Sequence, residues 1–271
     1  MKRHILMLSL LALCTACDIE SSDDPFTPVE TSIDAILPYL DFGVECKWRQ
    51  GEAVSVFAIT GVEKDGVGSV YYDHCKFTAS SDGATSALKG QAPAGADSYL
   101  GIYPYSDLND VSGTQFKITI PQNQTAATAR SVPFPLCAYA IAYGSGQQLI
   151  FTPICAWLSF SFELSDIQSL SLSTDYGDIS GTFGIYPDGE GGMVVSTIEA
   201  PTFPDVNITP PQGGFQKGEK YYVMIAASSW GYEGLCATIT RGGTQSKVQL
   251  RGEPVFLQAG DVLDLGTISV Q

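Results

Sequence analysis

Strict alternation of apolar and polar side chains constrains the fold of this chain more than any other feature of its sequence. Through residues 158–164, every second residue is Leu or Phe, and the residues between are Ser or Glu. Residues 116–120 repeat the pattern, with Lys117 and Thr119 on the face opposite the apolar residues. A period of two is typical of a half-buried β-strand. No stretch longer than about ten residues keeps a helical period, so the sequence predicts an all-β fold.

Further short strands are predicted along the whole chain, separated by turns rich in Gly and Pro. The strand candidates are residues 53–59, 70–78, 99–105, 136–143, 170–172, 181–186, 221–227, 235–240, 247–251 and 262–270. A Gly-rich turn is predicted between the first two, at residues 61–68. Turn signals recur at a spacing of roughly 8 to 12 residues, which is typical of sandwiches and barrels. Two sandwiches of about 120 residues each fit the length better than one. Since the strongest strand follows the turn Gly144-Ser145-Gly146, we predict an N-terminal β-sandwich at residues 31–148 and a C-terminal one at 149–271.

The N-terminus reads as a secretion signal that ends at a lipidated cysteine. Lys2 and Arg3 precede an apolar run at residues 5–13, which is far shorter than the about 20 residues of a spanning helix. The small residues Thr15 and Ala16 suit cleavage before Cys17, whose thiol would carry the lipid of a bacterial lipoprotein. We therefore predict a signal peptide at residues 1–16. An ordinary secretory signal with a free Cys17 is the alternative.

Residues 17–30 are expected to form an acidic, flexible tether. Four carboxylates lie among serines and prolines in residues 18–28, a composition that cannot bury a core. The stretch resembles the acidic tag of surface-exposed lipoproteins in Bacteroides-type bacteria. We accordingly expect the protein on the cell outer membrane, held by the lipid on Cys17 and exposed at the surface, with periplasmic display as the alternative.

The strongly acidic balance excludes several classes of partner. Removing residues 1–16 deletes two of the 14 basic residues and no acid, which leaves 12 bases against 29 acids, or a net charge of about −17. Nucleic acid and anionic membrane surfaces are therefore not expected as partners.

The cysteines beyond Cys17 do not have the spacing of a metal site or a redox motif. Their number is odd and no Cys-x-x-Cys pair occurs. Most lie in apolar, strand-like runs, so we expect buried free thiols, with a disulfide as the alternative that export would allow. These residues are Cys46, Cys75, Cys137, Cys155 and Cys236.

No catalytic or cofactor motif is present, and we predict that the protein is not an enzyme and holds no metal or cofactor. His74 is the single histidine after the signal peptide, and it alternates with aromatic residues on a predicted strand. We therefore expect His74 to have a structural role. Nucleophile-elbow, zinc-protease and phosphate-loop motifs are missing. A glycosidase would need two carboxylates about 5 to 10 Å apart, and no pair is marked by its surroundings.

Several aromatic residues suit either a sugar-binding surface or the core. They are the doublets Tyr71-Tyr72 and Tyr221-Tyr222, together with Trp230 and Tyr232. Aromatic residues on strands belong more often to a core or an interface. A surface glycan-binding lipoprotein of a polysaccharide-utilisation system is thus an alternative function, and it predicts a planar row of exposed aromatic side chains.

An ordered set of short motifs resembles the fimbrillin family, the lipoprotein pilins and fimbrillin-like proteins of Bacteroidia. The set spans nearly the whole chain after the signal peptide. Its members are Trp48-Arg49-Gln50-Gly51 before Val54-Ser55-Val56-Phe57, Leu100-Gly101-Ile102-Tyr103-Pro104-Tyr105, Ile118-Thr119-Ile120-Pro121-Gln122-Asn123-Gln124, the run from Phe151 to Phe160, Gly218-Glu219-Lys220-Tyr221-Tyr222 and Leu257-Gln258-Ala259-Gly260.

This resemblance implies two transthyretin-like Greek-key β-sandwich domains in tandem. It also implies a route of assembly, in which an extracellular trypsin-like protease removes the leader with the first strand. The exposed groove then accepts a strand from another subunit. Lys47 or Arg49 would be the processing site, because both precede the strand at Val54; an ordinary polar turn is the alternative for these two residues.

The sequence therefore predicts a fimbrial (pilus) structural or accessory subunit that is exported as a lipoprotein and contributes to adhesion. Its expected partners are other fimbrial subunits, the outer-membrane lipid bound through Cys17, and a surface glycan or host ligand. After processing it would lie in the fimbrium. Because the chain ends directly after the strand at 262–270, a tip, anchor or accessory role is as compatible with the sequence as a stalk role.

Overall fold

The computed structural model describes residues 5–6, 24–64, 67–112, 115–144, 148–187 and 193–269. Within these ranges all helical or strand structure is strand, and the strands form several sheets. The prediction of an all-β fold is therefore confirmed. No helix of the described part is long and apolar enough to cross a membrane.

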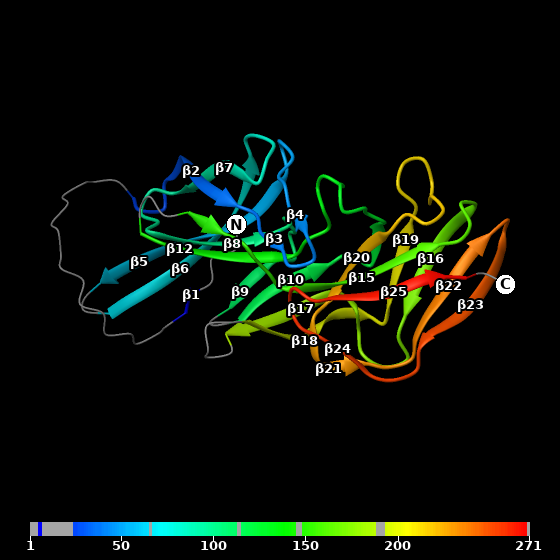
Figure 1. Cartoon of the computed structure of the whole chain (residues 1–271). Helices are drawn as coiled ribbons and strands as arrows, with labels where there is room; N and C mark the ends of the chain where they lie inside the picture. The colour runs from blue at the N-terminus through cyan, green and yellow to red at the C-terminus, as the bar shows by residue number, and fades with distance from the viewer. Residues whose placement is uncertain are drawn as a thin grey trace.

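One large sheet occupies the N-terminal end of the molecule (Figure 1). Its longest strands form a hairpin with twelve paired residues on each arm, because cross-strand pairing continues from Ala53–Thr78 to Lys64–Val67. The strands, in sheet order, are β13 (Leu149–Ile150), β2 (Pro28–Ile36), β7 (Thr85–Pro93), β6 (Val67–Ala79), β5 (Ala53–Lys64), β8 (Ser98–Tyr103), β12 (Ala138–Tyr143) and β14 (Thr152–Pro153), with β1 (Ile5–Leu6) paired to β6.

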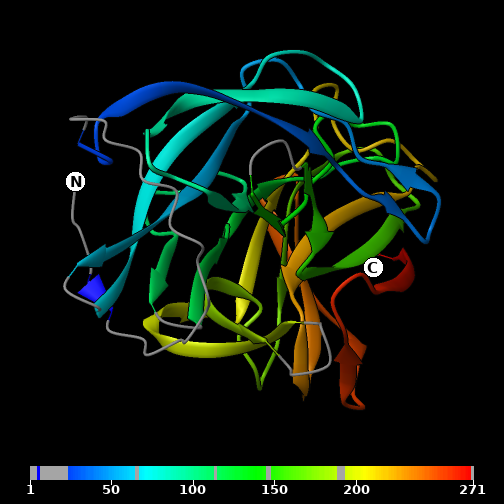
Figure 2. The same cartoon turned by 90° about the vertical axis from the view of Figure 1, so that its left-hand side faces the viewer.

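The two ends of this sheet meet. Its end strands β13 and β14 are separated in the chain by Phe151 alone, so the sheet must curl to bring them together. Phe151 donates its backbone N–H to the carbonyl of Ile36 at 2.9 Å, which ties this junction to the end of β2. Figure 2 shows the strands of this sheet curving around one end of the molecule. The curled sheet encloses a core that includes Trp48, Val56, Phe77, Leu88, Ile102 and Phe151.

Smaller sheets build the rest of the molecule. A five-stranded sheet runs in the order β11 (Asn123–Thr125), β19 (Asp205–Thr209), β16 (Ile167–Ser173), β22 (Leu235–Arg241) and β23 (Thr244–Arg251). A three-stranded sheet has the order β20 (Tyr221–Ala226), β15 (Cys155–Phe162) and β25 (Val262–Ile268). The two-stranded pairs are β3 (Tyr39–Leu40) with β4 (Val44–Glu45) and β21 (Ser228–Tyr232) with β24 (Val255–Leu257).

Strands from both sides of residue 148 share sheets. The four-stranded sheet β18 (Met193–Phe203), β17 (Ser180–Pro187), β10 (Gln115–Ile120) and β9 (Asp110–Ser112) joins β10 to β17 through five antiparallel pairs. The short strand β11 likewise pairs in parallel with β19. In the opposite direction, β13 and β14 belong to the N-terminal sheet. The division at residue 148 stays a prediction. A test of it must show whether each half folds without the strands that it shares with the other half.

The strongest alternating stretches are strands, with differences at their ends. Residues 116–120 lie in β10, where Ile118 and Ile120 are buried as predicted. β15 begins three residues before the predicted start and ends at Phe162, and its Ser159 is as buried as its apolar neighbours. Ser159 faces the parallel strand β25, where its hydroxyl bonds to Asp264 at 3.2 Å. The predicted turn at 61–68 is wrong over most of its length, because hairpin pairing extends through it.

Candidate functional site: the leader segment

The two predicted processing residues lie at the end of an extended run whose side chains alternate between core and solvent. Val44, Cys46 and Trp48 are buried. Lys47 and Arg49 are exposed, because successive side chains of an extended chain point to opposite faces. The structure thus brings both basic residues to the surface at the end of the leader segment, by which we mean described residues 24–49.

Lys47 and Arg49 differ in what surrounds them. Lys47 forms an ion pair with Glu45 at 2.9 Å, and about half of each side chain is exposed. The following residue, Trp48, has no exposed surface and pairs its backbone with Gly83 in both directions, at 2.7 and 3.1 Å. The Lys47–Trp48 peptide bond is therefore held in place by a buried anchor.

The Arg49–Gln50 peptide bond lies where the chain turns. Gln50 and Gly51 are exposed, and Gly51 has a φ of +87°, which favours glycine. The Arg49 guanidinium donates a hydrogen bond to the carbonyl of Val132. The backbone N–H of Arg49 donates a hydrogen bond to Glu52 Oε2 at 3.0 Å. Burial raises the pKa of Glu52, although the Arg49 backbone N–H and a hydrogen bond with Tyr103 oppose the shift.

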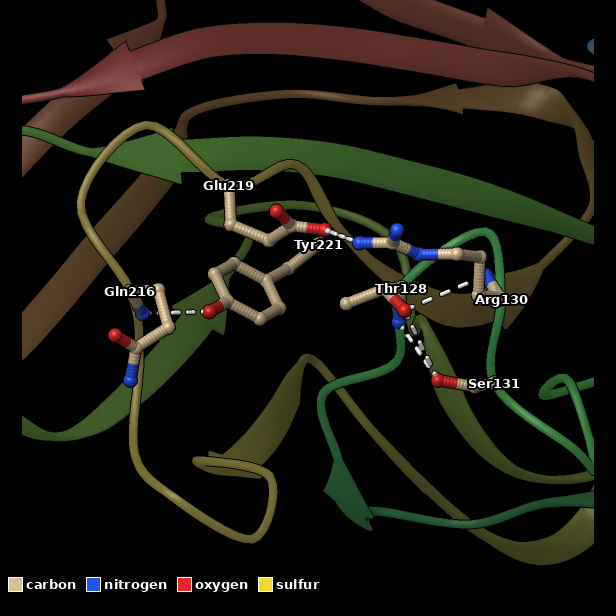
Figure 3. Close-up of polar contacts among 6 residues, drawn as sticks. All are labelled: Thr128, Arg130, Ser131, Gln216, Glu219 and Tyr221. Atoms are coloured by element: carbon tan, nitrogen blue, oxygen red, sulfur yellow. Dashed lines mark hydrogen bonds and ion pairs between the residues drawn. The ribbon is translucent and has the colours of Figure 1, made fainter.

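Val132 belongs to the loop that also contains Thr128, Arg130 and Ser131, which Figure 3 shows beside Glu219. In this loop the backbone N–H of Thr128 donates to Ser131 Oγ at 2.8 Å, and Arg130 lies 3.6 Å from Glu219 in an ion pair. On the Glu219 side of this ion pair, the Tyr221 hydroxyl accepts a hydrogen bond from the backbone N–H of Gln216 at 2.6 Å. The side chain of Arg49 therefore contacts a loop that is itself fastened to the segment before β20.

An aromatic cluster holds the middle of the leader segment. The half-buried ring of Phe42 stacks on Tyr222 at 5.6 Å and meets Trp157 edge-on at 5.3 Å. Phe134 contacts all three rings. Trp157 and Tyr222 lie on β15 and β20, so the leader segment packs against strands of the C-terminal half. The sequence analysis missed Phe42, which stands in no alternating stretch.

The first long strand of the leader segment is a full member of the N-terminal sheet. β2 forms nine antiparallel pairs with β7 and two parallel pairs with β13. Ile33 and Ala35 of this strand point into the core. Removal of the leader segment up to Arg49 would therefore leave one edge of β7 unpaired and uncover the core beneath Ile33, Ala35 and Trp48.

The other residues singled out in the sequence do not gather into a second site. Cys17 lies outside the described residues. His74 stacks between Phe57 at 4.6 Å and Tyr105 at 5.5 Å, and burial lowers its pKa while Asp107 and Asp110 oppose the shift. Among the described residues, no three His, Cys, Asp or Glu side chains are grouped so that they would hold a metal ion.

The tyrosine doublets do not form a planar exposed row. Tyr221 and Tyr222 are buried, and Tyr71 packs edge-on against Phe26 at 5.0 Å. Tyr232 is buried as well, and nothing is described for the side chain of Trp230. These doublets therefore serve packing rather than a flat sugar-binding face.

The five described cysteines are free, and four of them are buried, as predicted. Burial raises the pKa of Cys46 and of Cys155 to about 12 and that of Cys75 to about 11. The thiolate is the reactive form of cysteine, so the raised pKa values disfavour reaction of these thiols at neutral pH.

Comparison with known proteins gives matches among solved structures. No family model matches the chain. No curated protein matches it either. A putative cell adhesion protein from Bacteroides uniformis matches with 14% identity and a TM-score of 0.48, over 89% of this chain and 92% of that one. A fimbrial protein from Bacteroides ovatus matches with 12% identity and a TM-score of 0.40, over 88% and 49%. The tip fimbrial protein Mfa3 from Porphyromonas gingivalis matches with 9% identity and a TM-score of 0.36, over 84% and 83%.

Proposed function

We propose that this protein is a fimbrial subunit that is exported as a lipoprotein and assembles by strand addition once its leader segment has been cut. The observation that carries the proposal is the geometry of the leader segment. It contributes a complete core strand, β2, and it ends at an exposed arginine in a turn. A single cut at Arg49 would detach a strand from the sheet and leave a groove that an extended segment of another subunit can fill.

Arg49 is the better processing site of the two basic residues. A protease binds its substrate as an extended strand, so several residues around the cut must leave their native contacts. Cutting after Lys47 requires the fully buried Trp48 to leave the core. Cutting after Arg49 requires release of the exposed residues Gln50 and Gly51, whose backbone N–H groups bond to Asp82 at 2.6 Å and to Ala79 at 2.8 Å. Trp48 directly precedes Arg49, so it must loosen for either cut. The residues that follow the cut bond are exposed at Arg49, whereas Trp48 itself follows it at Lys47, and releasing exposed residues transfers no further apolar surface to water.

The proposal also covers the membrane anchor, the two domains and the partners of the subunit. Cys17 carries the lipid that holds the subunit on the outer membrane until processing. The two halves, residues 31–148 and 149–271, are transthyretin-like Greek-key sandwiches. The subunit has no catalytic role, its partners are other fimbrial subunits, and its contribution is to adhesion.

Cleavage and assembly test this function together. Purified protein is treated with a trypsin-like protease, the new N-terminus is mapped, and the product is examined for ladders that resist detergent. We expect cleavage after Arg49, followed by ladders. The substitution Arg49→Gln should prevent both, whereas Lys217→Gln, which removes an exposed basic residue in the turn before β20, should prevent neither. Correctly trimmed protein that stays monomeric would contradict assembly by strand addition.

Surface display has its own test. Intact cells that produce the protein are exposed to protease, and the residues released into the medium are identified. We expect the body of the chain from Gln50 onward in the medium and a lipid-bound fragment that contains Cys17 on the cells. Complete protection of the chain on intact cells would place it on the inner face of the membrane instead.

A further inference from the structure

Two strands at opposite ends of the molecule each keep one edge without a full partner. The edge of β2 that faces away from β7 pairs only at Ala35 and Ile36, with β13. Over residues 28–34 the described chain offers this edge no backbone partner. Seven of the eight residues of β23 pair with β22, with a register shift that leaves Leu250 unpaired, and no described strand lies on the other side of β23. Figure 1 shows β2 and β23 at opposite ends of the long direction of the molecule.

The two edges carry opposite charges at the same spacing. The exposed side chains of β2 include Glu30 and Asp34, and those of β23 include Lys247 and Arg251. In each pair the residues are four apart in the chain and both side chains are exposed, which corresponds to about 13 Å along a regular strand. On β23 the register shift at Leu250 lies between the two residues, so this distance is less regular there. The match is notable in a chain with a net charge of −15, which has few basic residues to place anywhere.

These charges have almost no partners within their own molecule. Lys247 and Arg251 take no part in the ion pairs of the described chain. Glu30 accepts one hydrogen bond from Gln91 at 3.2 Å, and Asp34 lies opposite Ala87. The two charged rows are therefore free to meet opposite charges on another molecule.

Apolar surface at the β23 edge is also incompletely covered. Val248, Leu250 and Leu265 are half-buried and line a groove between β23 and β25. Side chains of this kind are usually buried when a further strand continues the sheet. The inward face of β2, which carries Thr31 and Ile33, would continue the row formed by Val248 and Leu250.

We propose that the occupant of the β23 edge is β2 of a second copy of this chain. The two strands pair antiparallel, with Glu30 opposite Arg251, Ser32 opposite Gln249 and Asp34 opposite Lys247. Two sheets then join into one across the contact. This inference deepens the proposed fimbrial role, on which it rests for its setting, but it concerns the uncut chain in which β2 is still in place.

Such a contact propagates. β2 and β23 are different surfaces, so each copy that uses its β2 edge leaves its β23 edge open for the next copy. A head-to-tail contact of this type builds a ring or a filament rather than a closed two-fold dimer. The uncut subunits would thereby line up before the protease acts.

Charge reversal tests the pairing without protease. Sedimentation of the uncut chain, with Cys17→Ser to omit the lipid, is measured over a range of concentrations. Wild type should form chains whose length increases with concentration. Glu30→Lys with Asp34→Lys should weaken association about tenfold or more, because two attractive cross-strand pairs become repulsive. Lys247→Glu with Arg251→Glu should have the same effect.

The decisive sample is an equal mixture of the two variants. Each variant repels itself, but each edge of one variant is complementary to the opposite edge of the other, so alternating chains should form. As a control, Asp41→Lys with Glu163→Lys makes the same change in net charge at exposed sites away from both edges and should associate like wild type. A wild type that stays monomeric, or a mixture that associates no better than its components, would overturn the proposal.

The register has a separate readout. A chain with Asp34→Cys and Lys247→Cys, oxidised with glutathione disulfide, should form covalent ladders, since directly opposed residues bring their Cβ atoms within about 5.5 Å. Asp34→Cys with Arg251→Cys should form none, and ladders from this second pair alone would overturn the antiparallel arrangement. Because all these samples are uncut, failure here leaves assembly after cleavage standing. Failure of cleavage would equally leave this contact standing.

Discussion

At the scale of single residues, burial alternates along the leader segment and decides which side chains act as anchors. Trp48 and Phe42 hold the segment, and Lys47 and Arg49 are presented to solvent beside them. The anchor Trp48 and the proposed processing residues Lys47 and Arg49 are therefore neighbours in the chain but face opposite sides of it.

Replacing the anchor Phe42 should loosen the leader segment. We expect Phe42→Ala to lower the free energy of unfolding by about 2 kcal/mol, because its half-buried ring loses contact with Trp157 and Tyr222. Urea unfolding measures this change. The control Tyr39→Ala removes an aromatic residue of the same segment that is 69% exposed, and it should stay within about 0.5 kcal/mol of wild type. Equal effects of the two substitutions would contradict an anchoring role for Phe42.

The half-buried carboxyl of Glu52 predicts a pH dependence of stability next to the proposed processing site. Burial raises its pKa in the folded state, so ionisation costs the folded state more than the unfolded state. The contribution of Glu52 to stability is therefore greatest below its ordinary pKa and decreases as the pH rises through its folded pKa.

Glu52→Gln should remove this dependence. Urea unfolding of both proteins between about pH 4 and 7 gives the difference in stability between wild type and variant. We expect that difference to shift in favour of the variant as the pH rises. A difference that stays constant over this range would show that the folded and unfolded pKa values of Glu52 are equal.

At the scale of elements, the last strand depends on one carboxylate. Asp264 of β25 pairs with Lys220 at 2.6 Å and accepts hydrogen bonds from Ser159 at 3.2 Å and from the backbone N–H of Gly266 at 3.0 Å. The hydrogen bond from Lys220 is the main reason that the pKa of Asp264 lies below its ordinary value. Asp264 thus connects an edge strand to β15 and to the residue before β20.

Asp264→Asn should loosen β25 without unfolding the molecule. We expect faster amide hydrogen exchange in β25, corresponding to at most about 1 kcal/mol, because the ion pair is solvent-exposed. A lowered pKa stabilises the folded state above the ordinary carboxyl pKa, and this contribution is lost as the pH falls through the folded value. Wild type should therefore approach the exchange rate of the variant in acid. Unchanged exchange at neutral pH would contradict this role of Asp264.

At the scale of the whole molecule, strands exchanged across residue 148 bind the two halves together. β10 pairs with β17, and β11 pairs with β19. β10 and β11 precede the predicted second domain in the sequence, whereas β17 and β19 lie within it. The C-terminal sheets are therefore incomplete without residues 115–125.

Two fragments test how far the halves are independent. We expect residues 115–271 to unfold at a higher temperature than residues 149–271, because only the longer fragment contains the partners of β17 and β19. Circular dichroism on heating measures both. Equal midpoints would show that the C-terminal half folds without β10 and β11, and would support a boundary at residue 148.

Much of the fold could be predicted because alternation is a local property of the chain. Residues 116–120 and most of 158–164 are strands for the reason that their pattern indicates, since period two suits only a strand with one buried face. The turn predicted at 61–68 was wrong because glycine weakens a strand without ending it, and pairing with β6 over twelve residues outweighs that preference.

The sequence by itself determined that the chain is all-β, that most of its described thiols are buried, and that Lys47 and Arg49 precede a strand, because composition and period act within a few residues. Only the tertiary structure decided that Trp48 and Phe42 hold the leader segment, that Arg49 lies in a turn, and that β2 and β23 keep open edges at opposite ends. These features depend on contacts between residues far apart in the chain. Their energies come from pairing and burial that no local pattern records.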